Sequence, residues 1–140
     1  MNDTLSITIR VSVRFSEVDA IRTVWHGNYA KYLEDAREAF GTRYGLSYSY
    51  IFQNGYYAPM YDLQMHYRMV ATMGDVLFVR AAYRPSIGGK IIFDYEIRRE
   101  SDNALVLTAT STQLFTTHTG EFVPSCPPFY EEWKRTYGLK

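Results

Sequence analysis

The sequence has one cysteine and no excess of charge of either sign, and each shortage excludes a class of protein. Cys126 has no second cysteine for an intramolecular disulfide, so we expect a reducing compartment, the cytoplasm. The 15 basic and 15 acidic residues give a formal net charge of +0, which predicts no nucleic acid partner. No stretch approaches the roughly 18 consecutive apolar residues of a membrane span, so we expect none.

The first residues also lack the continuous apolar segment of a secretory signal peptide, because residues 1–14 alternate polar and apolar side chains. What the chain does have is apolar content, with 46% hydrophobic and 16% aromatic residues in a length of 140. Shorter blocks of this composition could not each bury enough apolar surface. We therefore expect a single domain over residues 1–140.

Hydrophobic periodicity predicts a strand followed by a long helix. In residues 5–15 every odd position is apolar and every even position is polar, which is the pattern of a half-buried strand. In residues 28–44 the apolar side chains recur at helical spacing. Asn28 is suited to cap the start of this helix, and Gly45 is suited to follow its end.

Strand character returns after a tyrosine-rich connector, at residues 60–69. The remaining predicted elements are a strand at 76–83, a turn at 85–89, a strand at 91–98, a turn at 101–103, a β-rich run at 105–115 and a short helix at 127–137. Three strands joined by short turns favour an antiparallel meander. The predicted class is α+β, with one antiparallel sheet covering one amphipathic helix.

The region around Asp19 carries a resemblance to a known family. Residues 14–19 read RFSEVD, residues 24–29 read VWHGNY and residues 32–37 read YLEDAR. This series is similar to the signature of the 4-hydroxybenzoyl-CoA thioesterase family of hotdog proteins. The later pairs Tyr67-Arg68 and Gly74-Asp75 and the stretch from Gly88 to Phe93 resemble weaker family motifs. Where many members have a glycine after the aspartate, this chain has AIRT at residues 20–23.

The resemblance implies a hotdog fold, a sheet wrapped around a long helix, and hydrolysis of an acyl-thioester without a cofactor. The substrate would be an acyl-CoA or an acyl-carrier-protein thioester. Asp19 would either attack the thioester carbonyl or activate a water, and both roles stay open. The amides of His26 and Gly27 would stabilise the oxyanion at the start of the helix, where one donor is typically worth about 3–4 kcal/mol. The structural alternative for Asp19 is to cap a turn or pair with Arg22.

Eight further residues are candidates for substrate binding, although aromatic residues at helical spacing are more often core and basic residues more often solvated. These candidates are Trp25, Asn28, Tyr29, Tyr67, Arg68, Gly88, Gly89 and Lys90. Glu17 is expected to face solvent at the end of the first strand. His66 and His118 have no ligand spacing, so we expect no metal site.

The same residues leave two alternative functions open and predict that the protein is an oligomer. A non-catalytic acyl-thioester-binding protein would keep the fold without needing Asp19, and a hotdog dehydratase or hydratase would pair a histidine with an acidic residue to move a proton. The spacing from Asp19 to Tyr29 favours hydrolysis over both. A lone sheet around one helix leaves an edge exposed, and residues 76–83 are apolar on both faces, so we expect a homodimer or homotetramer.

Overall fold

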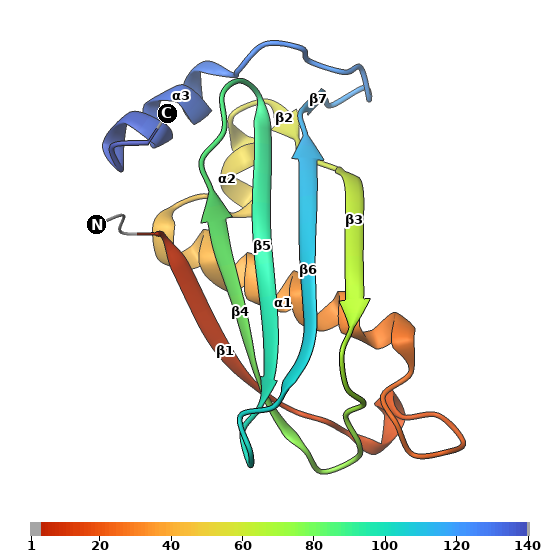
Figure 1. Ribbon diagram of the computed structural model, residues 1–140. Coiled ribbons are helices and arrows are strands. Elements are labelled where there is room, and N and C mark those ends of the chain that lie inside the picture. Colours follow the sequence, from red (N-terminus) through yellow and green to blue (C-terminus); the bar gives the residue numbers. More distant parts are fainter. Residues whose placement is uncertain (1–3, 140) are drawn as a thin grey trace.

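One five-stranded antiparallel sheet lies against one long helix in the computed structural model, which describes residues 4–139 (Figure 1). The elements are β1 (Ser6–Ser12), the short 3-10 helix η1 (Phe15–Glu17), α1 (His26–Tyr44), α2 (Tyr48–Gln53), β2 (Tyr56–Tyr57), β3 (Met60–Tyr67), β4 (Val76–Arg84), β5 (Lys90–Arg99), β6 (Leu105–Leu114), β7 (Thr116–Thr117) and α3 (Pro128–Thr136). No helix within the described residues is long and apolar enough to cross a membrane.

The order of strands in the sheet is β1-β4-β5-β6-β3, with every neighbouring pair antiparallel. This confirms the predicted α+β class and the β4-β5-β6 meander. β4 lies between β1 and β5 inside the sheet, as its apolar residues on both faces indicated. The two edges are formed by β1 and β3, so the backbone groups on the outer side of each have no partner strand in this chain.

The start of the long helix differs from the prediction. α1 begins at His26 with Trp25 at the N-cap position, so the assignment of Asn28 as N-cap is wrong. The Asn28 side chain instead donates to the carbonyl of Glu17 (2.9 Å). The end of the helix confirms the prediction that Gly45 follows it. Gly45 takes the left-handed conformation (φ 76°), and its amide donates a hydrogen bond to the carbonyl of Gly41. The first strand is also shorter than predicted, since the chain turns into η1 after Val13.

The tyrosine-rich connector contains two elements that periodicity did not indicate. Ser47 caps α2 by accepting a hydrogen bond from the amide of Tyr50 (3.2 Å), and β2 then pairs with β7. With α3, these elements gather at the end of the sheet that is uppermost in Figure 1. α3 contacts the β4-β5 turn, where Lys134 donates to the carbonyls of Ser86 and Gly88, and the start of α1 lies toward the opposite end.

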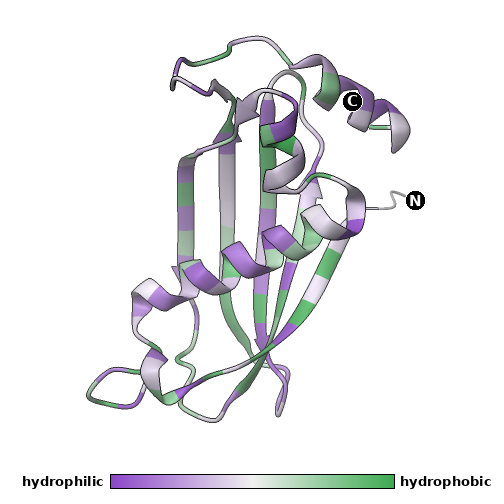
Figure 2. Cartoon of the chain, turned by 180° about the vertical axis from the view of Figure 1, so that it is seen from behind, coloured by the Kyte–Doolittle hydropathy of each residue, from purple (hydrophilic) through white to green (hydrophobic). Residues whose placement is uncertain are grey.

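The core lies between the inner face of the sheet and one side of α1, whose outer side is hydrophilic (Figure 2). Phe40 is fully buried at its centre. Its ring lies 4.8 Å from that of Phe93 on β5 and 6.4 Å from that of Trp133 on α3. One helix side chain therefore joins the sheet to the C-terminal helix through aromatic packing.

Replacing Phe40 with alanine should lower the free energy of unfolding by about 3–5 kcal/mol, because it removes a fully buried ring and leaves a cavity. Urea unfolding followed by circular dichroism measures this change. Phe15→Ala is the matched control, since Phe15 is 72% exposed, and it should shift stability by less than about 0.5 kcal/mol. Equal losses in both variants would contradict the central position of Phe40.

Candidate active site at the start of α1

The start of α1, the loop before it and the end of β3 come together at the lower end of the sheet in Figure 1. A bridge between Val18 and Val24 closes the intervening loop, which contains Asp19. The ring of Tyr29 on α1 lies 5.6 Å from that of Tyr67 at the end of β3. Elements that are distant in the sequence therefore place Asp19, residues 25–29 and Tyr67 in one region.

Asp19 is exposed in this loop, and its carboxylate also organises the loop. Its Oδ1 accepts hydrogen bonds from the amides of Ile21 (3.0 Å) and Thr23 (3.3 Å), and the Thr23 hydroxyl contacts both carboxylate oxygens at 3.3 Å. The turn-capping alternative is thus observed, whereas an ion pair with Arg22 is absent from the described residues. Capping holds the carboxylate in one orientation while leaving it open to solvent.

The unusual loop sequence has a conformational consequence at Arg22. This residue has φ 68°, in the left-handed region that favours glycine. Many members of the family that the sequence resembles carry a glycine in this segment. A non-glycine residue in this region carries backbone strain, which the hydrogen bonds of the loop must offset.

The first amides of α1 point out of the helix without partners of their own. Within residues 4–139, the amides of His26 and Gly27 donate to no acceptor outside the helix, and helix geometry provides none inside it. The indole of Trp25 lies over Gly27, so that a Cβ there would come within 2.1 Å of the ring. The Trp25 ring thus occupies the space next to the Gly27 backbone.

Glu17 lies beneath the helix start and is not the solvent-facing residue that we expected. Its carbonyl accepts hydrogen bonds from the Trp25 amide (3.0 Å) and the Asn28 side chain. Its carboxylate accepts hydrogen bonds from the Tyr32 hydroxyl (2.9 Å) and the Arg14 backbone amide (2.9 Å). The Glu17 side chain is only 12% exposed. The expectation failed because the chain enters η1 after β1 and turns this side chain inward.

These contacts change the acidity of Glu17 and its partner. Burial alone would raise the pKa of the Glu17 carboxyl, but the hydrogen bonds from Arg14 and Tyr32 outweigh it and hold the pKa below its usual value. Burial, followed by the hydrogen bond to the Glu17 carboxylate, raises the pKa of Tyr32. Glu17 is therefore ionised and Tyr32 neutral at neutral pH, which maintains the bond between them.

The remaining candidates at this end divide by exposure. Asn28 and Tyr29 are buried, so inside the protomer they support the helix start. Trp25 and Tyr67 are about half exposed, and Arg68 is exposed with a long contact to the hydroxyl of Thr108 (3.4 Å).

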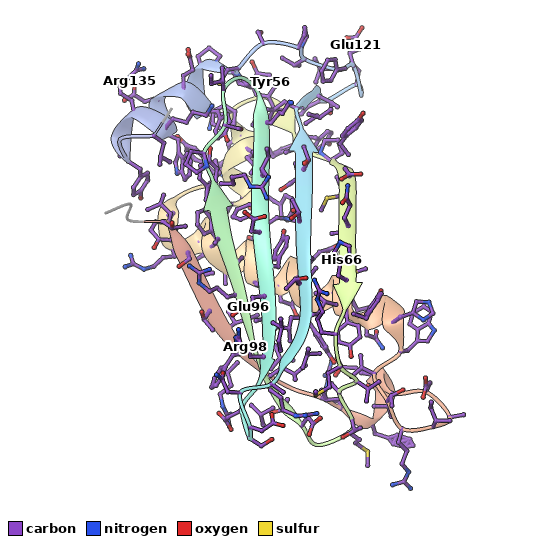
Figure 3. All side chains as sticks on the ribbon, viewed as in Figure 1. Tyr56, His66, Glu96, Arg98, Glu121 and Arg135 are labelled. Atoms are coloured by element: carbon purple, nitrogen blue, oxygen red, sulfur yellow. The ribbon has the colours of Figure 1, made fainter. Side chains whose placement is uncertain are left out.

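Gly88, Gly89 and Lys90 lie at the other end of the sheet. In β6, Leu107 pairs with Tyr67 and Leu114 pairs with Lys90, a separation of about 24 Å at the usual strand rise. Figure 3 labels His66 near the first end and Tyr56 near the second. The Gly88 carbonyl accepts a hydrogen bond from the Lys134 ammonium on α3. Gly89 is packed closely, because a Cβ at this position would lie 2.9 Å from the Ser125 carbonyl oxygen. One protomer does not bring these three residues to the helix start.

Comparison with known proteins identifies relatives of this chain. The sequence model of the thioesterase-like superfamily matches residues 13–133. A putative acyl-CoA thioesterase, YneP of Bacillus subtilis, is 27% identical over 104 residues, which is 74% of this chain and 75% of the relative.

The described part of the chain contains no cluster of three or more histidine, cysteine or acidic residues suited to a metal ion.

Solved structures show the same fold. The DHNA-CoA thioesterase of Staphylococcus aureus superposes with a TM-score of 0.84 at 22% identity, covering 95% of this chain and 89% of that one. The 4-hydroxybenzoyl-CoA thioesterase of Pseudomonas sp. strain CBS-3 superposes with a TM-score of 0.76 at 21% identity, covering 91% and 98%. The fold is therefore the hotdog fold that the resemblance implied.

Replacing Glu17 with glutamine should lower the free energy of unfolding by about 1–3 kcal/mol at pH 7, because the charged acceptor is lost. The folded-state pKa is lowered, so the stabilisation is present above the unfolded value of about 4.3 and disappears as pH falls through the folded value. Urea unfolding at pH 7 and pH 3 should show the difference from wild type shrinking at the lower pH.

Glu34→Gln changes an exposed glutamate on α1; it is the control and should leave stability unchanged at both pH values. A Glu17→Gln effect of the same size at pH 3 and pH 7 would refute the role of the charge.

Proposed function

The chain belongs to the thioesterase-like superfamily and is a thioester hydrolase, and we propose that it cleaves its substrate at the start of α1 with Asp19 as the essential carboxylate. The proposed substrate is an acyl-CoA, in line with the printed name of the Bacillus relative. An acyl-carrier-protein thioester presents the same reacting group.

The observation that carries this proposal is the pair of unpartnered amides on His26 and Gly27, next to a loop that holds an exposed carboxylate. Negative charge that develops on the thioester oxygen would be stabilised by these amides and by the positive end of the helix dipole. Glu17 keeps the helix start in position, since it binds the residues on both sides of these amides. Displacement of the exposed Trp25 ring would open the space over Gly27 to the substrate.

Asp19 acts either as a nucleophile or as a base, and in each route every bond and proton is accounted for. As nucleophile, its oxygen bonds to the acyl carbon, the C–S bond breaks, the thiolate takes a proton, and water hydrolyses the resulting anhydride. As base, it takes a proton from the water whose oxygen attacks, and that proton leaves with the thiol. His26 would orient the water or polarise the carbonyl. Trp25, Tyr67 and Arg68 are the exposed groups around this point that could contact the substrate.

We also propose that two protomers pair along β3. Exposed apolar side chains follow this edge, including Met60, Tyr61 and Tyr67, whereas the β1 edge presents Arg10 among small polar residues. Antiparallel pairing about a two-fold axis would set the start of β3 in one protomer beside its end in the other. The β2-β3 segment of the partner would then border the helix start, and the candidates Gly88, Gly89 and Lys90 could act only from a partner.

Asp19→Asn should reduce hydrolysis by at least about a hundredfold, because loss of a base or nucleophile typically costs about 10²–10⁴ in rate. The amide oxygen can still accept from Ile21 and Thr23, so the loop should keep its turn. Release of free thiol from a panel of acyl-CoAs, detected with a thiol reagent, measures the rate. Asp35→Asn, exposed on α1, should behave as wild type.

Near-normal turnover by Asp19→Asn would overturn the assignment of Asp19. Absence of thiol release by the wild type would favour a binding protein, and hydration or dehydration of the acyl group would favour the hydratase. His26→Ala should lose less activity than Asp19→Asn, since the backbone amide remains. Equal losses would make the His26 side chain a catalytic group.

Sedimentation or light scattering should give at least twice the 16.3 kDa mass of one chain. Tyr61→Asp, which places a charge at a residue 72% exposed on β3, should shift the equilibrium toward monomer and reduce activity with it. Ile87→Asp, exposed in the β4-β5 turn, is the control and should leave the mass unchanged. A fully active monomer would contradict a site that needs both protomers.

A further inference from the structure

Arg37 is a buried cation without a counter-ion. It lies on α1 with 9% of its surface exposed, and within residues 4–139 it forms no ion pair. Its Nε is buried with no hydrogen-bond partner. Glu34 and Glu38 are close in sequence, yet neither bridges to it. A guanidinium is charged at any physiological pH, so burial without a carboxylate carries a large desolvation cost.

The groups around Arg37 are neutral tyrosines. Its Nη2 donates to the hydroxyl of Tyr48, and its Cζ lies 5.4 Å from the centre of that ring. Tyr95 lies on the inner face of β5, and its hydroxyl is 2.8 Å from that of Ser111. Burial lowers the pKa of Arg37, and the nearby oxygens of Tyr95 and Tyr48 outweigh this effect. These contacts orient the guanidinium but supply no negative charge.

Arg37 also lines a groove that runs beside α1. The groove holds about 250 Å³, and α1 contributes Ala30, Leu33, Glu34 and Arg37 to its wall. These positions recur at three- and four-residue spacing, so they form one stripe along the helix. Ala30 is one turn from Gly27. Met60 and Leu63 of β3 line the opposite side, which places the groove beside the edge where a second protomer would pair.

We propose that this groove receives the acyl chain of the substrate and that Arg37 binds a carboxylate at its far end. The inference rests on the proposed function, because the thioester must be held at the start of α1 for the chain to enter the groove. An ω-carboxyacyl-CoA, the monothioester of a dicarboxylic acid, is the class of substrate that fits. Its carboxylate would accept hydrogen bonds from the terminal nitrogens of Arg37, which supplies the missing counter-ion.

The distance between Gly27 and Arg37 along α1 sets the length of acyl chain that the groove would hold. Gly27 and Arg37 are ten residues apart, or about 15 Å along the axis, and the arginine side chain tilts back toward the start of the helix. The remaining span suits an extended chain on the order of ten carbons or somewhat fewer. Decanedioic acid, linked to CoA through one of its carboxyls, is therefore the probe of choice.

Binding of two non-hydrolysable thioethers tests the proposal without requiring turnover. S-decyl-CoA and its ω-carboxy analogue differ only at the end that would reach Arg37, and calorimetry gives a Kd for each. In Arg37→Met the preference for the carboxylated ligand, expressed as the ratio of the two Kd values, should fall by about ten- to a hundredfold relative to wild type. Methionine has a similar volume and removes the buried charge, so the fold should be retained.

Arg43→Met removes an exposed arginine on the same helix and should keep the wild-type ratio, which separates a local contact from general charge. Arg37→Gln gives the same comparison if the methionine variant unfolds. A ratio within about twofold of wild type in the folded Arg37 variant overturns the proposal. Thiol release from decanoyl-CoA and from the CoA monothioester of decanedioic acid tests the proposed function separately: hydrolysis of either with an unchanged Kd ratio refutes only the carboxylate site, and an Arg37-dependent ratio with hydrolysis of neither refutes only the catalysis.

Discussion

The placement of the candidate active site depends on the contacts of Glu17. Its carbonyl and its carboxylate both accept hydrogen bonds, so this single residue joins η1 to the N-cap, the first turn and the second turn of α1. An oxyanion site built from backbone amides requires that the helix start be held in place before the substrate arrives, because no side chain aims the donors. Glu17, a partly buried and ionised glutamate with a neutral tyrosine partner, would fulfil that requirement.

The region around the helix start is exposed, while α3 packs its aromatic side chains against the opposite end of the sheet. α3 places Lys134 on the carbonyls of Ser86 and Gly88, and Tyr130 donates to the Lys90 carbonyl (2.6 Å). The β4-β5 turn is thus held by structural contacts. Arg22, with its left-handed backbone, and the Trp25 ring over Gly27 lie at the other end, which is the proposed site of substrate entry. The contacts of α3 that stabilise the fold and the proposed substrate site therefore lie at opposite ends of the strands.

The proposed groove relates the edge of the sheet to the choice of substrate. A partner that paired along β3 would form the outer wall of the groove next to Met60 and Leu63, so that assembly would determine how deep the acyl site is. Arg37 would then distinguish acyl groups by what they carry at the far end. A buried guanidinium rejects an uncharged alkyl end, which leaves the charge unpaired, more strongly than an apolar pocket rejects an extra polar group.

The sequence by itself determined the order of the main strands and helices, the α+β class and the segment that carries Asp19, because period-two and helical spacing and a local motif are properties of neighbouring residues. Tertiary structure decided the roles of Glu17, Asn28 and Arg37. Glu17 faces inward only because η1 turns the chain beneath α1, and Asn28 is used by the Glu17 carbonyl instead of capping the helix. Arg37 lies four residues after Leu33 on the apolar stripe, a signal available in the sequence. Its lack of a counter-ion among residues 4–139 depends on which residues β5 and α2 bring around it.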